Sequence, residues 1–261
     1  MKHFILFKVL ITLILCIQPT IALGKACNVV TMTGNPEYAP VTWDLNDKLV
    51  GSYIEFTKTA LDRIGVASKP VVSGNWSRAQ QVVKMGVVDM LIGPWFNTDR
   101  ESWLTFIQPE VSLDPAAVFT RKDNMFPFEN LRSLIGKQGV MQSGNSYGEP
   151  YDSMVANKVL MMFEVNSWEQ AFEMVKRRRA EYLVLGLYSG QLTIARLGVG
   201  EHIGPLPVYA AEDKMYIAFS KKSPCEPLAE QLGKAVAQLK EEKLFEKLTK
   251  KYIDLYNAST Q

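Results

Sequence analysis

The chain has 261 residues, with 29 lysine and arginine residues against 27 aspartate and glutamate residues. This length allows one large domain or two small ones, and the near balance of charge does not indicate binding to nucleic acid or anionic lipid. Of its two histidines, His3 falls in the leader segment described next, which leaves His202 alone. A site of several histidines around zinc or iron is therefore excluded, and few routes to a nucleophilic triad remain. We expect no metal and no cofactor.

The first 24 residues have the features of a secretory signal peptide. They contain two lysines and no acidic residue, and the apolar run Val9–Ile17 is shorter than the roughly 20 residues of a spanning helix. Small residues at 22 and 24 favour cleavage before Lys25, and Ala26–Cys27 is a second candidate site. A lipid anchor on Cys27 is the alternative, although the residues before it suit that signal poorly. Removal of residues 1–24 takes away the two lysines and leaves 27 basic against 27 acidic residues. We expect a soluble, monomeric protein in the periplasm.

Two cysteines, Cys27 and Cys225, remain after the signal peptide is removed. In an oxidising compartment an even pair of cysteines forms a disulfide more often than a redox centre. The pair also lacks the Cys-x-x-Cys spacing of an oxidoreductase. We therefore expect a structural disulfide.

The most informative stretch of the chain is Trp76–Pro109. It combines an amphipathic helix, a short apolar strand at Val88–Ile92, and a polar segment just past the end of that strand. Ligands of open α/β sheets bind outside the carboxyl ends of strands. Arg100 lies in this segment, and its planar guanidinium suits a carboxylate. The alternative for Arg100 is a surface ion pair with Asp99 or Glu101.

A second helix and strand repeat this arrangement. Trp168 and Glu181 stand at the same separation as Trp76 and Asp89, and an apolar strand at 182–187 follows the second helix. Two such units favour two lobes, although any two βαβ units look alike. The other expected elements are a strand at 28–33, a loop at 34–47, a helix at 52–64, an extended segment at 111–121, a helix at 150–161, a strand at 215–220, and two amphipathic helices after 224.

In this order the motifs resemble the family 3 periplasmic solute-binding proteins, the receptors that feed polar amino acids to ABC importers. The resemblance covers nearly the whole chain after the signal peptide. Asn97 stands where the family has the threonine of a Thr-x-x-Arg segment. The matching residues are Asn35–Pro40 and Leu49–Gly51 for the opening motifs, Trp76, Gly86, Asp89 and Arg100 for the helix and strand that follow, and Ser220–Pro224 before the closing helices.

The resemblance implies a type II, two-lobed α/β fold in which each lobe is a mixed sheet flanked by helices and two strands form a hinge. We expect residues 25–113 and 212–261 in lobe 1 and residues 114–211 in lobe 2, after a signal peptide at 1–24. The lobes would close on a small polar ligand, amino-acid-like or a carboxylate. The partner would be an ABC permease in the inner membrane or a sensor protein.

The resemblance also implies that Arg100 grips the ligand's carboxylate and that lobe 2 completes the pocket. The segment at 143–146 precedes a helix and offers N–H groups and hydroxyls to an anion. Ser146 matches a hydroxyl position of the family and Asn145 replaces another; an ordinary helix cap is the alternative. Aromatic walls are implied at Tyr38 and Trp76, with core packing as the alternative. The expected ligand-binding residues are Tyr38, Trp76, Trp95 (whose bulk would shrink the pocket), Asn97, Arg100, Asn145, Ser146 and Tyr188.

The chain departs from the family where a ligand's amino group would bind. Amino-acid receptors of this family usually carry an aspartate after the strand that corresponds to 182–187, whereas residues 185–190 contain no acid. A buried ammonium without a carboxylate partner is costly. The sequence therefore leaves two ligand classes open, an amino acid whose amine is held by Glu149 or Asp152, and a carboxylate without an amine. Arg78 is equally compatible with the cleft and with solvent.

We expect a binding protein without catalytic residues. Fold does not fix function, so an enzyme on the same scaffold is one alternative. Periplasmic cyclohexadienyl dehydratases resemble these receptors, and the acid–base group would then be Glu173 or Glu181. A protein that binds other proteins and no small ligand is a further alternative.

Overall fold

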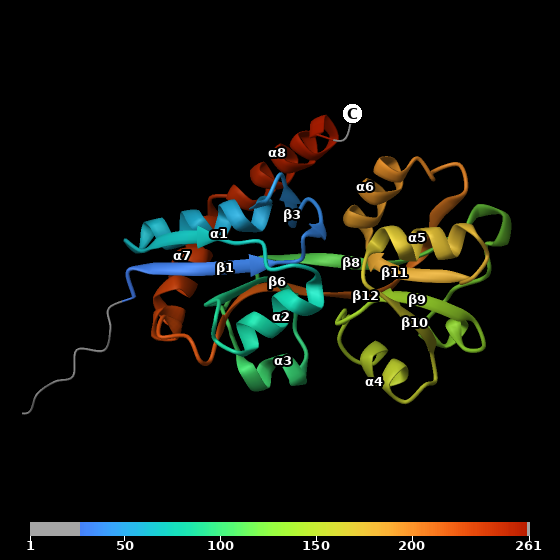
Figure 1. Ribbon diagram of the computed structural model, residues 1–261, viewed down its shortest axis with the longest axis horizontal. Helices are drawn as coiled ribbons and strands as arrows, with labels where there is room; N and C mark the ends of the chain where they lie inside the picture. The colour runs from blue at the N-terminus through green and yellow to red at the C-terminus, as the bar shows by residue number, and fades with distance from the viewer. Residues whose placement is uncertain (1–26, 260–261) are drawn as a thin grey trace, which may run out of the picture.

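The structure is a computed structural model that describes residues 27–259. Two lobes lie side by side along the long axis, with β8 (Ser112–Arg121) and β12 (Ile203–Ser220) running between them (Figure 1). The expected signal peptide at 1–24 lies outside the described residues. This arrangement confirms the mixed α/β, two-lobed fold expected from the sequence.

One continuous sheet passes through both lobes, in the order β10-β9-β11-β8-β12-β6-β1-β5. At each end its strands pair in parallel, as β1 does with β5 and β6, and β9 with β10 and β11. The strands of lobe 1 are β1 (Val29–Gly34), β5 (Ala67–Pro70), β6 (Met90–Trp95) and β7 (Leu104–Phe106), and those of lobe 2 are β9 (Gln138–Gln142), β10 (Met161–Val165) and β11 (Tyr182–Gly186).

The middle of the sheet is antiparallel and joins the lobes. Strand β12 pairs with β8 from Ile203 to Met215, and its last residues pair with β6 and β7 of lobe 1. Strand β8 pairs on its other side with β11 of lobe 2. The two long strands therefore link the lobes within one sheet, β8 through its pairing with β11 of lobe 2 and β12 through its pairing with β6 and β7 of lobe 1.

Helices cover both faces of the sheet (Figure 1). Capping side chains begin three of them, because Asn75 accepts from Arg78 N, Asn97 accepts from Arg100 N and Ser167 accepts from Gln170 N. Lobe 1 has α1 (Ser52–Arg63), α2 (Trp76–Lys84), α3 (Thr98–Trp103), α7 (Ala229–Glu241) and α8 (Leu244–Ser259), and lobe 2 has α4 (Tyr151–Ala156), α5 (Trp168–Lys176) and α6 (Leu187–Leu197).

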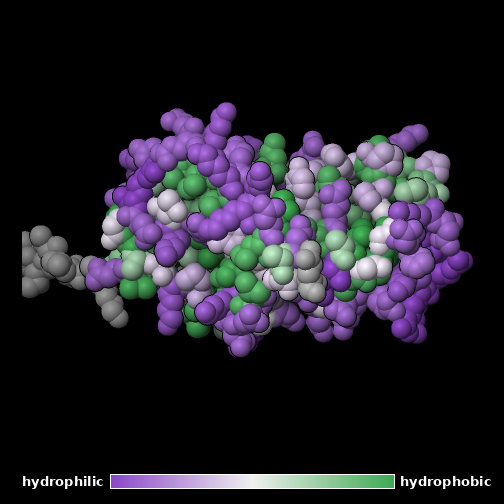
Figure 2. Space-filling view, turned by 90° about the horizontal axis from the view of Figure 1, so that it is seen from above, coloured by the Kyte–Doolittle hydropathy of each residue, from purple (hydrophilic) through white to green (hydrophobic). Residues whose placement is uncertain are grey.

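The two helices of the repeated helix and strand pattern, α2 and α5, each bury apolar side chains in their own lobe, as the sequence predicted. Trp76 and Val83 of α2 are buried in lobe 1, and Trp168 and Phe172 of α5 are buried in lobe 2. Hydrophilic residues cover most of the face seen in Figure 2, with smaller hydrophobic areas between them. Among the described residues no helix combines the length and apolar character needed to cross a membrane.

Three segments differ from the sequence expectation. The expected helix at 150–161 ends at Ala156, because Lys158 has a left-handed φ of 57° and turns the chain into β10. The expected loop at 34–47 contains strands of a small separate sheet. The helix α6, which follows β11, was not predicted from the sequence. The small sheet consists of β2 (Glu37–Tyr38), β3 (Thr42–Leu45) and β4 (Lys48–Val50).

The expected disulfide is formed between Cys27 and Cys225, whose Cα atoms lie 5.2 Å apart. It joins Cys27, two residues before β1, to Cys225, the residue before a short 3₁₀ turn that leads into α7. Because the sulfur of Cys27 is used in this bond, the structure contradicts the alternative of a lipid anchor on Cys27.

We predict that Cys27→Ser together with Cys225→Ser destabilises the protein. The bond closes a loop of 198 residues, for which the chain-entropy relation gives about 5 kcal/mol, and we expect a measured loss of roughly 2–5 kcal/mol in the free energy of unfolding. Urea unfolding of both proteins, with and without a reducing agent, measures the loss. A reducing agent should lower the free energy of unfolding of the wild type to that of the double variant. It should leave the free energy of unfolding of the variant unchanged. Equal stability of the two oxidised proteins would contradict the prediction.

Candidate ligand-binding cleft

Arg100 is positioned by the start of α3, immediately after β6. Asn97 caps this helix, with its side-chain oxygen accepting from the N–H of Arg100 at 2.7 Å. The short link from strand end to helix directs the arginine side chain inward, where it is 3% exposed. The polar segment after β6 thus delivers its one arginine to the space between the lobes.

The guanidinium of Arg100 is bound by neutral oxygens. Nε donates to Gln80 Oε1 at 3.2 Å and Nη1 to the carbonyl of Trp95 at 2.9 Å, and the group lies 5.5 Å from the ring centroid of Trp76. Burial lowers the pKa of Arg100 to about 10, while Asp152 and Asp99 oppose this shift. Arg100 forms no ion pair within residues 27–259, so the expected alternative of a surface ion pair is not observed.

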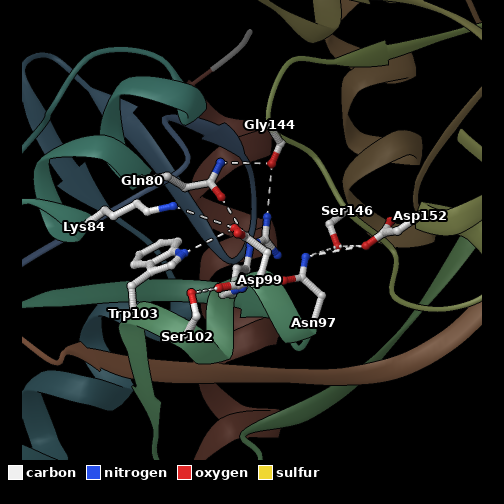
Figure 3. Close-up of polar contacts among 10 residues, drawn as sticks. Gln80, Lys84, Asn97, Asp99, Ser102, Trp103, Gly144, Ser146 and Asp152 are labelled. Carbon is white, nitrogen blue, oxygen red and sulfur yellow. Dashed lines mark hydrogen bonds and ion pairs between the residues drawn. The ribbon is translucent and has the colours of Figure 1, made fainter. Parts of the chain in front are cut away.

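A single carbonyl of lobe 2, that of Gly144, accepts three donors from lobe 1. They are Trp76 Nε1 at 3.1 Å, Gln80 Nε2 at 2.9 Å and Arg100 Nη2 at 3.1 Å. Figure 3 shows the Gly144 oxygen facing Gln80. Gly144 has a left-handed φ of 78°, and a Cβ there would lie 2.6 Å from the Gln80 amide nitrogen. The three donors mark a place where lobe 1 binds an oxygen.

A second contact between the lobes lies beside the first. Asn97 Nδ2 donates to Ser146 Oγ at 2.8 Å, and Ser146 donates to Asp152 Oδ2 at 2.5 Å (Figure 3). Asp152 Oδ1 also accepts the N–H of Tyr147 at 3.0 Å. The expected site residues Asn97 and Ser146 therefore bind one another across the cleft, and Asp152 stabilises the loop that carries Ser146.

Five of the expected residues line one small cavity around Arg100. Its volume is about 10 Å³, which is close to the size of one water molecule. Trp95 accounts for part of this confinement, since its ring packs edge-on against Tyr147 at 5.2 Å between centroids. A larger solute would enter only after the lobes move apart. The lining residues are Asn35, Tyr38, Val41, Thr42, Trp76, Ile92, Gly93, Trp95, Arg100 and Asn145.

Further polar contacts join the lobes at β2 of lobe 1. Asn35 Nδ2 donates to Gln142 Oε1 at 2.8 Å, and Glu37 Oε2 accepts from Gln142 Nε2 and from the N–H of Trp168, each at 3.0 Å. Burial raises the pKa of Glu37, while the bond from Trp168 opposes the shift. The contacts across the cleft are thus mainly hydrogen bonds.

A buried acid, Asp114, lies on β8 beside the cleft. It is 5% exposed; its Oδ2 accepts from Tyr38 Oη at 2.6 Å, and its Oδ1 has no hydrogen-bond partner. Burial raises the pKa of Asp114 to about 7, and the bond from Tyr38 lowers it. Burial also raises the pKa values of Tyr53 and Tyr147, so these two hydroxyls near Asp114 are neutral.

Other residues considered from the sequence lie elsewhere. Tyr188 is 51% exposed and does not line the Arg100 cavity, and Arg78 is exposed on α2. Glu149 is exposed and accepts from Ser153, so it does not reach the cleft. Of the two candidate acid–base residues, Glu173 pairs with Arg177 on α5, and Glu181 accepts the N–H of Gln138.

Sequence reasoning missed several residues of the cleft. Gln80 stands four residues after Trp76, and this i, i+4 spacing places both on one face of α2, which is a signal that was available. The acceptor at Gly144 is a backbone carbonyl and carries no side-chain signal. The other residues missed are Asn35, Gln142, Tyr147 and Asp114.

The family model for bacterial extracellular solute-binding proteins, family 3, matches residues 30–255. The chain belongs to this family. No curated protein sequence matches the chain.

Solved structures show the same fold at low sequence identity. A mutant of ArgBP from T. maritima superposes with a TM-score of 0.72 at 19% identity, over 87% of this chain and 96% of that one. A histidine kinase sensor domain with similarity to periplasmic binding proteins gives 0.73 at 20% identity, over 86% and 95%. The amino acid ABC transporter substrate-binding protein AbpA from Streptococcus pneumoniae, bound to L-arginine, gives 0.72 at 17% identity, over 90% and 97%.

We predict that Asp114→Asn changes stability in a pH-dependent way. Because burial raises the pKa of Asp114 from 3.8 to about 7, the folded state favours the protonated acid. This stabilisation is complete below pH 3.8 and is lost as the pH rises through 7. Full ionisation costs on the order of 4 kcal/mol, so the melting temperature of Asp114→Asn should rise relative to the wild type by several degrees between about pH 4 and about pH 8.5.

Thermal unfolding of both proteins at the two pH values measures this difference. The raised pKa of Glu37 is common to both proteins and cancels in the comparison. A melting difference that is the same at both pH values would show that Asp114 does not titrate in this range.

Proposed function

We propose that this protein is a periplasmic receptor that closes two lobes on a small solute carrying a carboxylate. The observation that carries the proposal is the buried guanidinium of Arg100, which has no ion-pair partner among residues 27–259. Together with Trp76 and Gln80 it directs donors at one oxygen of lobe 2. A carboxylate oxygen at this place would accept the same donors and would also supply the missing negative charge.

When the lobes open and close again, the ligand would replace the Gly144 carbonyl as the acceptor of these donors. We divide the chain into lobe 1, residues 25–113 and 212–261, and lobe 2, residues 114–211, so that the two crossings of the hinge fall in β8 and β12. The polar contacts at Asn35 and Glu37 support closure of this kind, because hydrogen bonds to water replace them when the lobes separate.

The family supports a proposal for the destination of the solute. Its members are extracellular solute-binding proteins, and AbpA, with the same fold, is named as part of an amino acid ABC transporter. We infer that the chain is exported by its signal peptide and delivers the solute to an ABC permease. A sensor partner is the second candidate, since a histidine kinase sensor domain shares the fold.

An acid–base enzyme on this scaffold is less well supported. The two glutamates considered for that role, Glu173 and Glu181, form their contacts outside the cavity around Arg100. A binding role uses the cleft residues as they stand, since Arg100 and its neighbours donate hydrogen bonds. We therefore assign the protein as a non-catalytic receptor.

We predict that Arg100→Gln abolishes most of the affinity for the carboxylate solute. The substitution keeps a hydrogen-bonding side chain and removes the charge and the two-pronged donor set, which is worth about 3 kcal/mol, or roughly a hundredfold in Kd. The solute is first identified by native mass spectrometry of protein purified without unfolding. Calorimetric titration of the wild type and the variant then gives the two Kd values.

Arg78→Gln is the matched control, since Arg78 is an exposed arginine on the neighbouring helix. It should bind within about twofold of the wild type, and circular dichroism should show both variants folded. An unchanged Kd in Arg100→Gln would refute the assignment of Arg100, and a solute recovered as a chemically converted product would refute the receptor.

A further inference from the structure

The path of the large sheet ends in two strands that differ in how they expose their outer edge. Strand β5 is the last strand on the lobe 1 side, and β10 is the last on the lobe 2 side. The edge at β5 carries Lys69 and Pro70, two residue types that discourage pairing with a further strand. Strand β10, with the sequence MMFEV, contains neither type, and its Met161 and Phe163 are 49% and 44% exposed. The sheet is therefore protected against a further strand at β5 and open at β10.

The backbone groups of β10 point alternately toward β9 and away from it. The carbonyl of Val165 accepts the N–H of Ser143, the residue after β9, so Val165 and the residues two and four positions before it point their groups toward β9. The N–H and C=O groups of Met162 and Glu164 therefore point outward. Among residues 27–259, β9 is the one strand that pairs with β10. The four outward groups have no strand partner there and are available to a strand of another molecule.

The N–H groups on either side of this open segment are already used within the chain. The N–H of Leu160 donates to a backbone carbonyl of α4, and the N–H of Asn166 donates to Gln170 Oε1. The open part of the edge is thus short and is centred on Phe163. A partner strand can form up to four backbone hydrogen bonds with it, and such main-chain bonds supply the affinity when a strand is added to a sheet edge.

A second copy of β10, antiparallel to the first, fits this edge in one register. With Phe163 on the two-fold axis, Met162 of one copy is opposite Glu164 of the other, and all outward groups of both copies are paired. With Glu164 on the axis, two carboxylates would stand directly opposite one another, which is unfavourable. With Met162 on the axis, Glu164 would be opposite Leu160, whose N–H is already used. The register centred on Phe163 therefore pairs every outward group and separates the two glutamates.

The side chains of β10 favour the same register. Met161, Phe163 and Val165 lie on one face of the strand. Pairing about Phe163 brings the two phenylalanine rings together at a position without hydrogen bonds, where opposite side chains are closest, and sets Met161 opposite Val165 of the other copy. The exposed apolar atoms of Met161 and Phe163 would then be covered. On the other face, each Glu164 is opposite an uncharged Met162.

We propose that two copies of this chain associate through β10 as an antiparallel, two-fold pair, so that one sheet runs through both molecules. Two strands of five residues bury much less than the roughly 1,600 Å² of a stable dimer. The association is therefore weak, with a Kd of about 10–100 µM, and the monomer expected from the sequence is the state below this concentration. Strand β10 does not line the cavity around Arg100, so the proposal is independent of the proposed ligand.

Sedimentation velocity of the full mature protein, from about 1 µM to about 1 mM, measures this association. The wild type should pass from monomer to dimer within this range. Phe163→Lys places two like charges opposite one another at the axis. Glu164→Pro removes an outward N–H from each copy and no hydrogen bond to β9, which proline at a strand edge allows. Each variant should raise the Kd of the dimer by about tenfold or more.

Two matched control variants should dimerise at least as well as the wild type. Glu164→Val removes the same side chain as Glu164→Pro and keeps the N–H and a preference for strands. Val87→Lys makes the same kind of change as Phe163→Lys at an apolar residue of lobe 1 that is 69% exposed. Circular dichroism and thermal unfolding of each variant show whether it is folded.

Two cysteine variants test the register itself. Phe163→Cys in both copies would place the new cysteines opposite one another, with Cα atoms about 4.5 Å apart, a distance that a disulfide spans. Glu164→Cys would place them on a diagonal, about 7–8 Å apart, which is too far. Mild oxidation should therefore join Phe163→Cys into a covalent dimer and leave Glu164→Cys largely monomeric.

Three results would overturn the proposal. The first is a wild type that remains monomeric up to about 1 mM. The second is a dimer that persists unchanged in Phe163→Lys and Glu164→Pro, because the copies would then associate through another surface. The third is equal cross-linking of Phe163→Cys and Glu164→Cys, which would contradict the register. If the lysine and proline variants fail to fold, the comparison of the two cysteine variants decides.

Discussion

The desolvation of one guanidinium is the constraint on which the cleft depends. Burial of Arg100 removes its water, and three neutral oxygens replace part of that hydration. Two of these oxygens come from lobe 1, and the third, from Gly144, belongs to lobe 2. Burial of the arginine and contact between the lobes are therefore one event. An open cleft leaves the group hydrated, and a closed cleft requires an acceptor from the other side.

The remaining contacts across the cleft share a chemical character with this one. Glu37 binds the first N–H of α5, where the helix dipole favours a negative charge, and Asn35 and Gln142 exchange a hydrogen bond nearby. Water solvates these polar groups well when the lobes separate, and few apolar atoms become exposed. The large apolar side chains, such as Trp168 and Phe119, lie in the cores of the lobes. The residues that stabilise each lobe thus differ from those that join the lobes across the cleft.

Much of this structure follows from periodic patterns, and the rest from contacts that have no local pattern. The helices at Trp76 and Trp168 and the strand that ends at Gly186 repeat apolar residues at helix or strand spacing, which fixes their burial and hence the fold. Arg100 was predictable because a polar segment after a buried strand carries it. Asp114 was not, because its position beside Gly186 depends on the register of an antiparallel pair. Gly144 acts through its carbonyl, which every residue type shares.

The short helix α4 shows a further limit of such patterns. Its first residues suit a helix, and the chain leaves the helix after Asn157, because Lys158 has a left-handed φ. The strand β10 that follows pairs with β9 and has Met161 and Phe163 exposed at the sheet edge. Propensity favoured a longer helix, and pairing with the sheet outweighed it.

The bond between Cys27 and Cys225 makes a covalent ring of almost the whole described chain, with both lobes and both long strands inside it. A break at any one peptide bond between these cysteines leaves the two pieces joined. Cleavage of an exposed loop in lobe 2, for instance, yields a nicked molecule of unchanged mass apart from the added water. The lobes stay tethered even when one of the two strands between them is cut. The disulfide would therefore keep the pieces of this chain together through a single cut that would divide an open chain.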